Sequence, residues 1–110
     1  MAFNSTQAFK VARRFQNKNG VDTRTLDAEA FTASYKDGSY QVVTASGVSA
    51  SSFVLPAPKD GSYFWIHNPA VSSQSLNVND HNGATKATLA AGEGCLIICD
   101  ATAWHIIIKA

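Results

Sequence analysis

This chain of 110 residues has little of the material from which active sites and membrane anchors are built. It holds two cysteines, three prolines and three histidines, and only 15% of its residues are charged. No segment is apolar over the length that a membrane-spanning helix needs, and residues 1–5 lack the apolar core of a signal peptide. Its apolar content of 45% is ordinary for a folded domain and argues against a disordered chain. We therefore expect one domain with no membrane association, assembled in the cytoplasm.

The two cysteines, Cys95 and Cys99, predict buried thiols and a reducing compartment. If both lie in one strand, four residues at about 3.3 Å rise place them roughly 13 Å apart, which is too far for a disulfide. They then share one face of the strand, where a free cysteine behaves as a small hydrophobic residue. Their spacing also lacks the two-residue gap and the further ligands of a zinc site.

Apolar residues recur with a period close to two over most of the chain, which predicts short β-strands. Two Lys-Asp-Gly-Ser turns, at 36–39 and 59–62, and an Asn-Gly turn at 82–83 separate some of these runs. The Lys-Asp-Gly-Ser sequence is too short to establish an internal repeat. We expect an all-β fold, a single small β-sandwich, jelly roll or β-barrel. Its strands are expected at 31–35, 40–44, 53–55, 62–68, 76–78, 85–89, 95–99 and 103–108.

Three of these runs, at 62–68, 95–99 and 103–108, carry apolar side chains on both faces. One face of each strand can fill the core of the domain. The other face must meet a second sheet or another chain, because large apolar patches facing water are uncommon on soluble monomers. The pattern therefore predicts a structural, self-associating protein. Its expected apolar anchor residues are Trp65, Ile66, Trp104, Ile106 and Ile108.

Residues 1–25 predict a basic arm ahead of a β domain at 26–110. The arm holds five Lys and Arg residues against one Asp, a charge of +4, whereas the rest holds four Lys against seven acids, a charge of −3. A short helix and an extended strand fit its pattern equally well. Such an arm suits an acidic surface, for example that of a neighbouring subunit. Nucleic acid is disfavoured because the whole chain is near neutral. The residues expected to grip the partner are Phe9, Arg13, Arg14 and Phe15.

No motif predicts catalysis or a cofactor. No serine stands in a Gly-x-Ser-x-Gly elbow, and the turn at 92–94 lacks the Lys-Ser/Thr pair of a phosphate loop. Asp27, Glu29 and Glu93 form no carboxylate pair suited to glycoside hydrolysis. His67 and His105 have no third ligand at a supporting spacing. The sequence thus predicts no enzyme, no metal, no cofactor and no small-molecule substrate.

The chain from Phe53 to Ile108 carries four motifs in order: a leucine-proline pair, an aromatic stretch ending in asparagine, a glycine turn and a threonine-x-tryptophan ending. They are Phe53-Val54-Leu55-Pro56, Phe64-Trp65-Ile66-His67-Asn68, Leu89-Ala90-Ala91-Gly92-Glu93 and Thr102-Ala103-Trp104-His105-Ile106. This arrangement resembles small virion proteins of tailed bacteriophages, above all head decoration (cement or staple) proteins built on a β-barrel or jelly roll. The resemblance implies a homodimer or homotrimer seated on major capsid protein at the outer surface of the virion. It implies a role in reinforcing the shell and brings no catalytic residues.

A second hypothesis is a phage tail-fibre or receptor-binding β domain that recognises a cell-surface glycan, because similar strands occur in tail-fibre and baseplate domains. It requires Trp65 or Trp104 to be exposed in a groove, where the indole can stack on a sugar ring. A tryptophan that is buried in the core between two sheets cannot play this role, because its indole is not accessible to a sugar ring.

Overall fold

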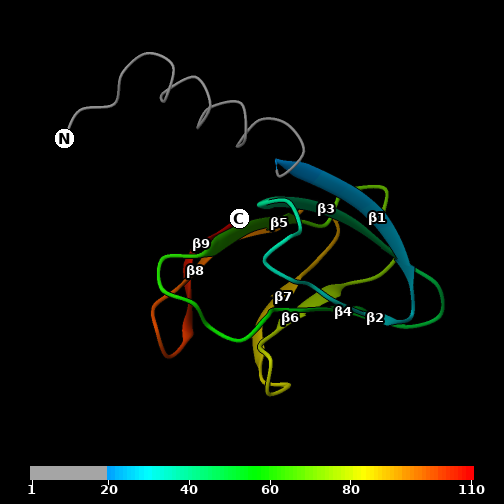
Figure 1. The fold of residues 1–110 in the computed structure, drawn as a ribbon. Coiled ribbons are helices and arrows are strands. Elements are labelled where there is room, and N and C mark those ends of the chain that lie inside the picture. Colours follow the sequence, from blue (N-terminus) through cyan, green and yellow to red (C-terminus); the bar gives the residue numbers. More distant parts are fainter. Residues whose placement is uncertain (1–19) are drawn as a thin grey trace, which may run out of the picture.

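The computed structural model describes residues 20–110, which form nine β-strands in two facing sheets (Figure 1). The five-stranded sheet has the order β1-β3-β5-β8-β9 and the four-stranded sheet the order β2-β4-β6-β7. The strands are β1 Val21–Asp27, β2 Ala30–Thr32, β3 Tyr40–Ser46, β4 Ser51–Val54, β5 Tyr63–His67, β6 Leu76–Asn79, β7 Thr85–Leu89, β8 Gly94–Cys99 and β9 Trp104–Lys109.

The chain crosses from the five-stranded to the four-stranded sheet three times in succession, as β1–β2, β3–β4 and β5–β6. Strands from successive passes pair in parallel, β1 with β3 with β5 and β2 with β4 with β6. The first six strands thus wind as a coil of three turns, and β7, β8 and β9 complete the sheets by antiparallel pairing. The predicted β-sandwich is confirmed. The β-barrel alternative is wrong because both sheets are open, and a jelly roll would need antiparallel neighbours throughout.

The two Lys-Asp-Gly-Ser segments occupy similar places in this coil. Residues 36–39 lead from β2 to β3, and residues 59–62 lead from β4 to β5. Both therefore return the chain from the four-stranded to the five-stranded sheet, and neither forms a hairpin. The tetrapeptide that looked too short to mark a repeat does fall at successive turns of a structural repeat.

The domain begins earlier than the predicted boundary at residue 26. Strand β1 pairs with β3 along its whole length, from Val21 opposite Tyr40 to Asp27 opposite Ser46. Residues 21–25 are therefore part of the five-stranded sheet and do not belong to an arm.

The core lies between the two sheets and is built from alternate residues of nearly every strand. Phe53 and Phe64 meet edge to face with ring centres 5.9 Å apart, and Phe64 contacts Trp104 at 5.8 Å. The Trp104 indole Nε1 donates a hydrogen bond of 2.9 Å to the Pro56 carbonyl oxygen. The two cysteines are free and buried, as the sequence predicts. The buried apolar residues are Leu26, Ala33, Val43, Ala45, Phe53, Leu55, Phe64, Ile66, Leu76, Val78, Ala87, Leu89, Cys95, Ile97, Cys99 and Trp104.

Candidate functional site

One line of side chains crosses the outer face of the five-stranded sheet, with one residue from each strand. We call it the apolar row: Val21, Tyr40, Trp65, Leu96 and Ile108. Each is the register partner of the next, so the row is continuous from β1 to β9. Val21 is 52% exposed, Tyr40 41%, Trp65 41% and Ile108 51%, while Leu96 is half-buried. Exposed aromatic and branched side chains on neighbouring strands form an apolar patch, which on soluble proteins often marks a binding surface.

The residues beside the apolar row on the same outer face add no formal charge to it. Val42 and His67 flank the row on one side and Tyr63 and Ile98 on the other, as the strand register requires. All four are partly buried by their neighbours. The apolar row and its flanks thus contain no Asp, Glu, Lys or Arg. Depletion of charge together with aromatic residues is typical of the centre of a protein–protein interface.

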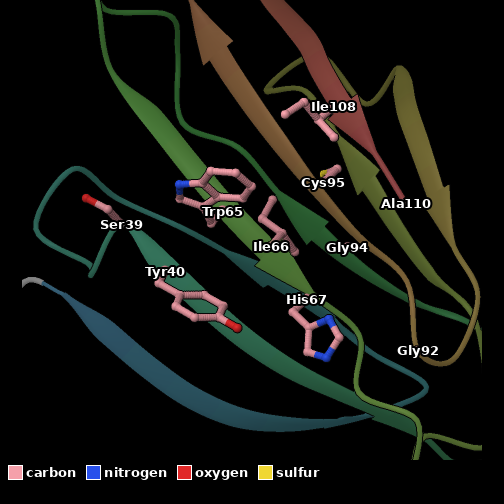
Figure 2. A pocket seen from close by; sticks show the side chains of 10 residues that line it. All are labelled: Ser39, Tyr40, Trp65, Ile66, His67, Gly92, Gly94, Cys95, Ile108 and Ala110. Carbon is pink, nitrogen blue, oxygen red and sulfur yellow. The ribbon is translucent and has the colours of Figure 1, made fainter.

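A groove of about 510 Å³ opens on this face beside Trp65. Figure 2 shows its wall of rings from Tyr40, Trp65 and His67, with Ile108 on the far side. Gly94 lines the groove, and a Cβ at this position would crowd the Ile66 carbonyl oxygen at 3.1 Å and His67 Nδ1 at 3.4 Å. The groove therefore offers an aromatic wall and a bare stretch of backbone to whatever docks there.

The outer face of the four-stranded sheet has the opposite character. Most of its alternate positions carry Ser, Asn and Thr, and two threonine hydroxyl groups bond across strands to asparagine oxygens. Thr88 Oγ1 donates to Asn77 Oδ1 at 3.0 Å, and Thr85 Oγ1 donates to Asn79 Oδ1 at 2.9 Å. The four-stranded sheet thus has a mostly polar outer face, whereas the apolar row crosses the outer face of the five-stranded sheet.

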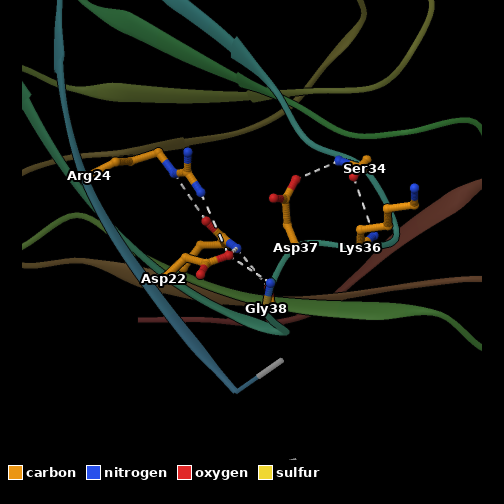
Figure 3. Close-up of polar contacts among 7 residues, drawn as sticks. Asp22, Arg24, Ser34, Lys36, Asp37 and Gly38 are labelled. Atoms are coloured by element: carbon orange, nitrogen blue, oxygen red, sulfur yellow. Dashed lines mark hydrogen bonds and ion pairs between the residues drawn. The ribbon is translucent and has the colours of Figure 1, made fainter. Parts of the chain in front are cut away.

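The edge strand β1 is held by a polar network on its inward side (Figure 3). Gln41, fully buried, donates to Asp22 Oδ2 at 3.0 Å and to the Gly38 carbonyl at 2.7 Å, and accepts from Arg24 Nε at 3.2 Å. The Gly38 amide donates to Asp22 Oδ2 at 2.7 Å, and this bond is the main cause that holds the pKa of Asp22 below its usual value. The Arg24 guanidinium lies 3.6 Å from the centre of the Phe31 ring. Charges that point inward on an edge strand discourage pairing with another sheet edge.

The predicted anchor residues divide between the outer face and the core. Trp65 and Ile108 lie in the apolar row. Ile66 and Trp104 are 1% and 2% exposed and belong to the core, so the expectation that they anchor the interface is wrong. Ile106 is partly buried and packs against the core. Side chains alternate between the two faces of each strand, as expected. When a strand is apolar on both faces, however, the sequence does not show which face turns toward the core.

The residues expected in the arm, Phe9, Arg13, Arg14 and Phe15, lie outside the described part of the chain. Three residues of the apolar row were missed from the sequence, namely Val21, Tyr40 and Leu96. Tyr40 and Leu96 belong to expected strands, but only the register shows that they align with Trp65. Val21 lies in β1, which was not expected as a strand.

Within residues 20–110, no group of three or more His, Cys, Asp and Glu side chains is placed to hold a metal ion. His105 Nε2 lies 2.9 Å from Asp100 Oδ2, and both side chains are exposed. Asp100 also accepts hydrogen bonds from the Thr102 and Ala103 amides, and the Thr102 bond is the largest cause that keeps the pKa of Asp100 well below its usual range. This cluster closes the turn between β8 and β9.

No family model, curated protein or solved structure matches this chain. In the described part of the chain, no helix has the length and apolar character needed to cross a membrane.

Proposed function

We propose that this protein is a structural virion protein, a capsid decoration protein that self-associates and binds the major capsid protein shell from outside. The observation that carries the proposal is the apolar row, which continues in register over all five strands of one outer face. The proposed location on the virion comes from the resemblance of residues 53–108 to phage head proteins.

The apolar row favours a protein partner because of its size and composition. Contiguous apolar surface that lacks charge is costly to leave in water and gains free energy at about 25 cal/mol per Å² when covered. Tyrosine and tryptophan supply large contact area with few rotatable bonds and are enriched at interfaces. A row fixed on β-strands is also preorganised, so little conformational entropy is lost on docking.

Attachment to the shell is assigned to the basic N-terminal segment, with Phe9, Arg13, Arg14 and Phe15 as the gripping residues. This assignment is a prediction from the sequence alone. The mechanism is mass action: a ligand that binds only the assembled shell stabilises it by an amount set by its occupancy. Many copies on one particle would then raise its resistance to internal pressure.

The test is co-sedimentation of the full chain with empty phage shells. We expect the wild-type protein to sediment with the shells and to raise the temperature at which they fall apart. A double variant, Arg13→Glu with Arg14→Glu, should bind less. Ala30→Glu, which adds one charge to an exposed residue of β2 on the polar outer face, is the control and should bind normally. Failure of the wild-type protein to sediment with any shell would remove the proposal.

A second candidate function, recognition of a cell-surface glycan, is favoured by one observation: Trp65 is exposed in a groove beside Tyr40 and His67. Indole stacking on a sugar ring needs such an exposed face, and Trp104 cannot provide it because it is buried. Titration with cell-surface polysaccharide should then shift the fluorescence of the wild-type protein and not that of Trp65→Ala. An unchanged spectrum together with intact shell binding would end this candidate.

A further inference from the structure

We propose that the apolar row is the contact between two copies of this chain, packed face to face about a twofold axis that runs along β5. The inference rests on the self-association in the proposed function and deepens it by naming the partner, the face and the symmetry. Three features of the described residues lead to this choice: the order of side chains in the row, the absence of charge, and the protection of the sheet edges.

The order of side chains makes the apolar row complementary to itself. Trp65 is on β5, the middle strand of five, and the row ends in Val21 on one side and Ile108 on the other. A twofold axis along β5 places Val21 of one copy over Ile108 of the other and Tyr40 over Leu96. Aliphatic side chains then meet at the rim and the two Trp65 rings lie near the centre. Such an isologous contact uses one patch twice.

The electrostatics allow identical faces to meet. The apolar row and its flanks contain no Asp, Glu, Lys or Arg, so pairing of the face with itself brings no like charges together. Juxtaposed like charges are what normally suppresses such pairings. The four-stranded sheet would bury hydrogen-bonded Thr and Asn side chains in the same arrangement, with much less apolar contact to offset their desolvation.

The size of the face suits a dimer. Five strands about 4.8 Å apart and about 20 Å long cover on the order of 450 Å² in projection, and corrugated side chains expose more than the projection. The projected area is somewhat more than half of the roughly 800 Å² per partner of a standard interface, which suits a weak, reversible dimer. The groove of about 510 Å³ beside Trp65 leaves room for an indole from the other copy. Tryptophan and tyrosine near the centre of an interface are typical binding hot spots.

The edges of the five-stranded sheet do not favour side-by-side pairing instead. Strand β1 points Asp22 and Arg24 inward, and β9 carries Lys109, whose Nζ lies 3.6 Å from Glu93 Oε1. Inward charges and lysines on edge strands are devices that oppose edge-to-edge association. Face-to-face packing is therefore the arrangement that remains for this sheet.

The experiment is sedimentation equilibrium of the full chain. We expect a dimer of wild-type protein in the micromolar range, and dissociation constants at least about 100-fold higher for Trp65→Glu and for Tyr40→Glu, because both changes place charge in a desolvated centre. Ala30→Glu adds the same charge to the polar outer face and should leave the dimer intact. Circular dichroism of each variant checks that it is folded.

A second measurement needs no variant. Trp104 is buried within each copy, so a change of tryptophan emission on dilution of the wild-type protein reports Trp65. We expect a red shift as the dimer dissociates. A monomer at high concentration, a trimer, or a dimer that tolerates Trp65→Glu while folded would each overturn the inference. A dimer that ignores phage shells would keep the inference and remove the proposed function.

Discussion

Replacement of Asp22 by Asn should destabilise the domain at neutral pH and do so much less in acid. The Asp22 carboxylate accepts charge-assisted hydrogen bonds from the Gly38 amide at 2.7 Å and from Gln41 Nε2 at 3.0 Å. These bonds tie β1 and the loop before β3 to the buried Gln41 side chain. The variant therefore tests whether charge on an edge strand holds the first turn of the coil in place.

The expected cost follows from the kind of bonds that are lost. A hydrogen bond to a charged group contributes about 1.5–3 kcal/mol, roughly twice the contribution of a neutral one. Asn keeps one acceptor oxygen but no charge, and the side chain at this position is 30% exposed, so water offsets part of the loss. We expect about 2 kcal/mol, which for a domain of this size lowers Tm by about 8 °C.

The pH dependence has a defined sign. The pKa of Asp22 is lower in the folded than in the unfolded state, where it is about 3.9. Its stabilising contribution is therefore full above about pH 5 and is lost as the pH falls through the folded value. Urea unfolding of wild type and Asp22→Asn should give a difference in unfolding free energy that is largest near pH 7 and shrinks below about pH 4.

Asp60→Asn is the matched control, because Asp60 is exposed, and it should change the unfolding free energy by less than about 0.5 kcal/mol at every pH. A loss for Asp22→Asn that is the same at pH 7 and pH 3 would show that the shape of the Asp22 side chain, and not its charge, stabilises β1. No loss at pH 7 would show that the network does not stabilise β1.

Three further predictions concern the core and one turn. Trp104→Phe removes the indole donor from the partly buried Pro56 carbonyl oxygen and leaves a small void, so urea unfolding should show a loss of about 2 kcal/mol. An unchanged midpoint would contradict the buried placement of Trp104. Cys95 should react with iodoacetamide only after unfolding, because burial raises the pKa of its thiol to about 11. Rapid labelling of Cys95 in the native protein, measured by mass spectrometry, would contradict its burial. Gly47→Ala should lower the free energy of unfolding by about 1–2 kcal/mol, because φ at Gly47 is 95° and the added Cβ would lie 2.1 Å from Asp27 Oδ1. A thermal melt identical to that of wild type would show that the turn at Gly47 has another conformation.

Most strands could be predicted from the sequence because their side chains alternate. The aromatic run around Trp65 and the run between the two cysteines appear within a residue or two of β5 and β8. Strand β1 was missed because only Leu26 of its inward side chains is apolar, while Asp22 and Arg24 fill the other inward positions. A strand without an apolar face leaves no trace in a pattern of hydrophobicity.

The parallel coil could not be predicted, because pairing depends on contacts between residues far apart in the chain. The turn composition at 36–39 fits a hairpin locally, and nothing in those four residues shows that the next strand belongs to the other sheet. The same limit applies to the apolar row. Its members are separated by 12 to 31 residues along the chain, and only the register of five strands aligns them.

In the proposed function, one outer face of this sandwich is covered by another protein molecule. The most direct measurement is the mass of the full chain in solution across a range of concentrations. We expect a species of twice 11.7 kDa that dissociates on dilution while Trp65 becomes accessible to a soluble quencher. A folded species of 11.7 kDa that persists at about 100 µM, with Trp65 equally quenched at every concentration, would contradict it.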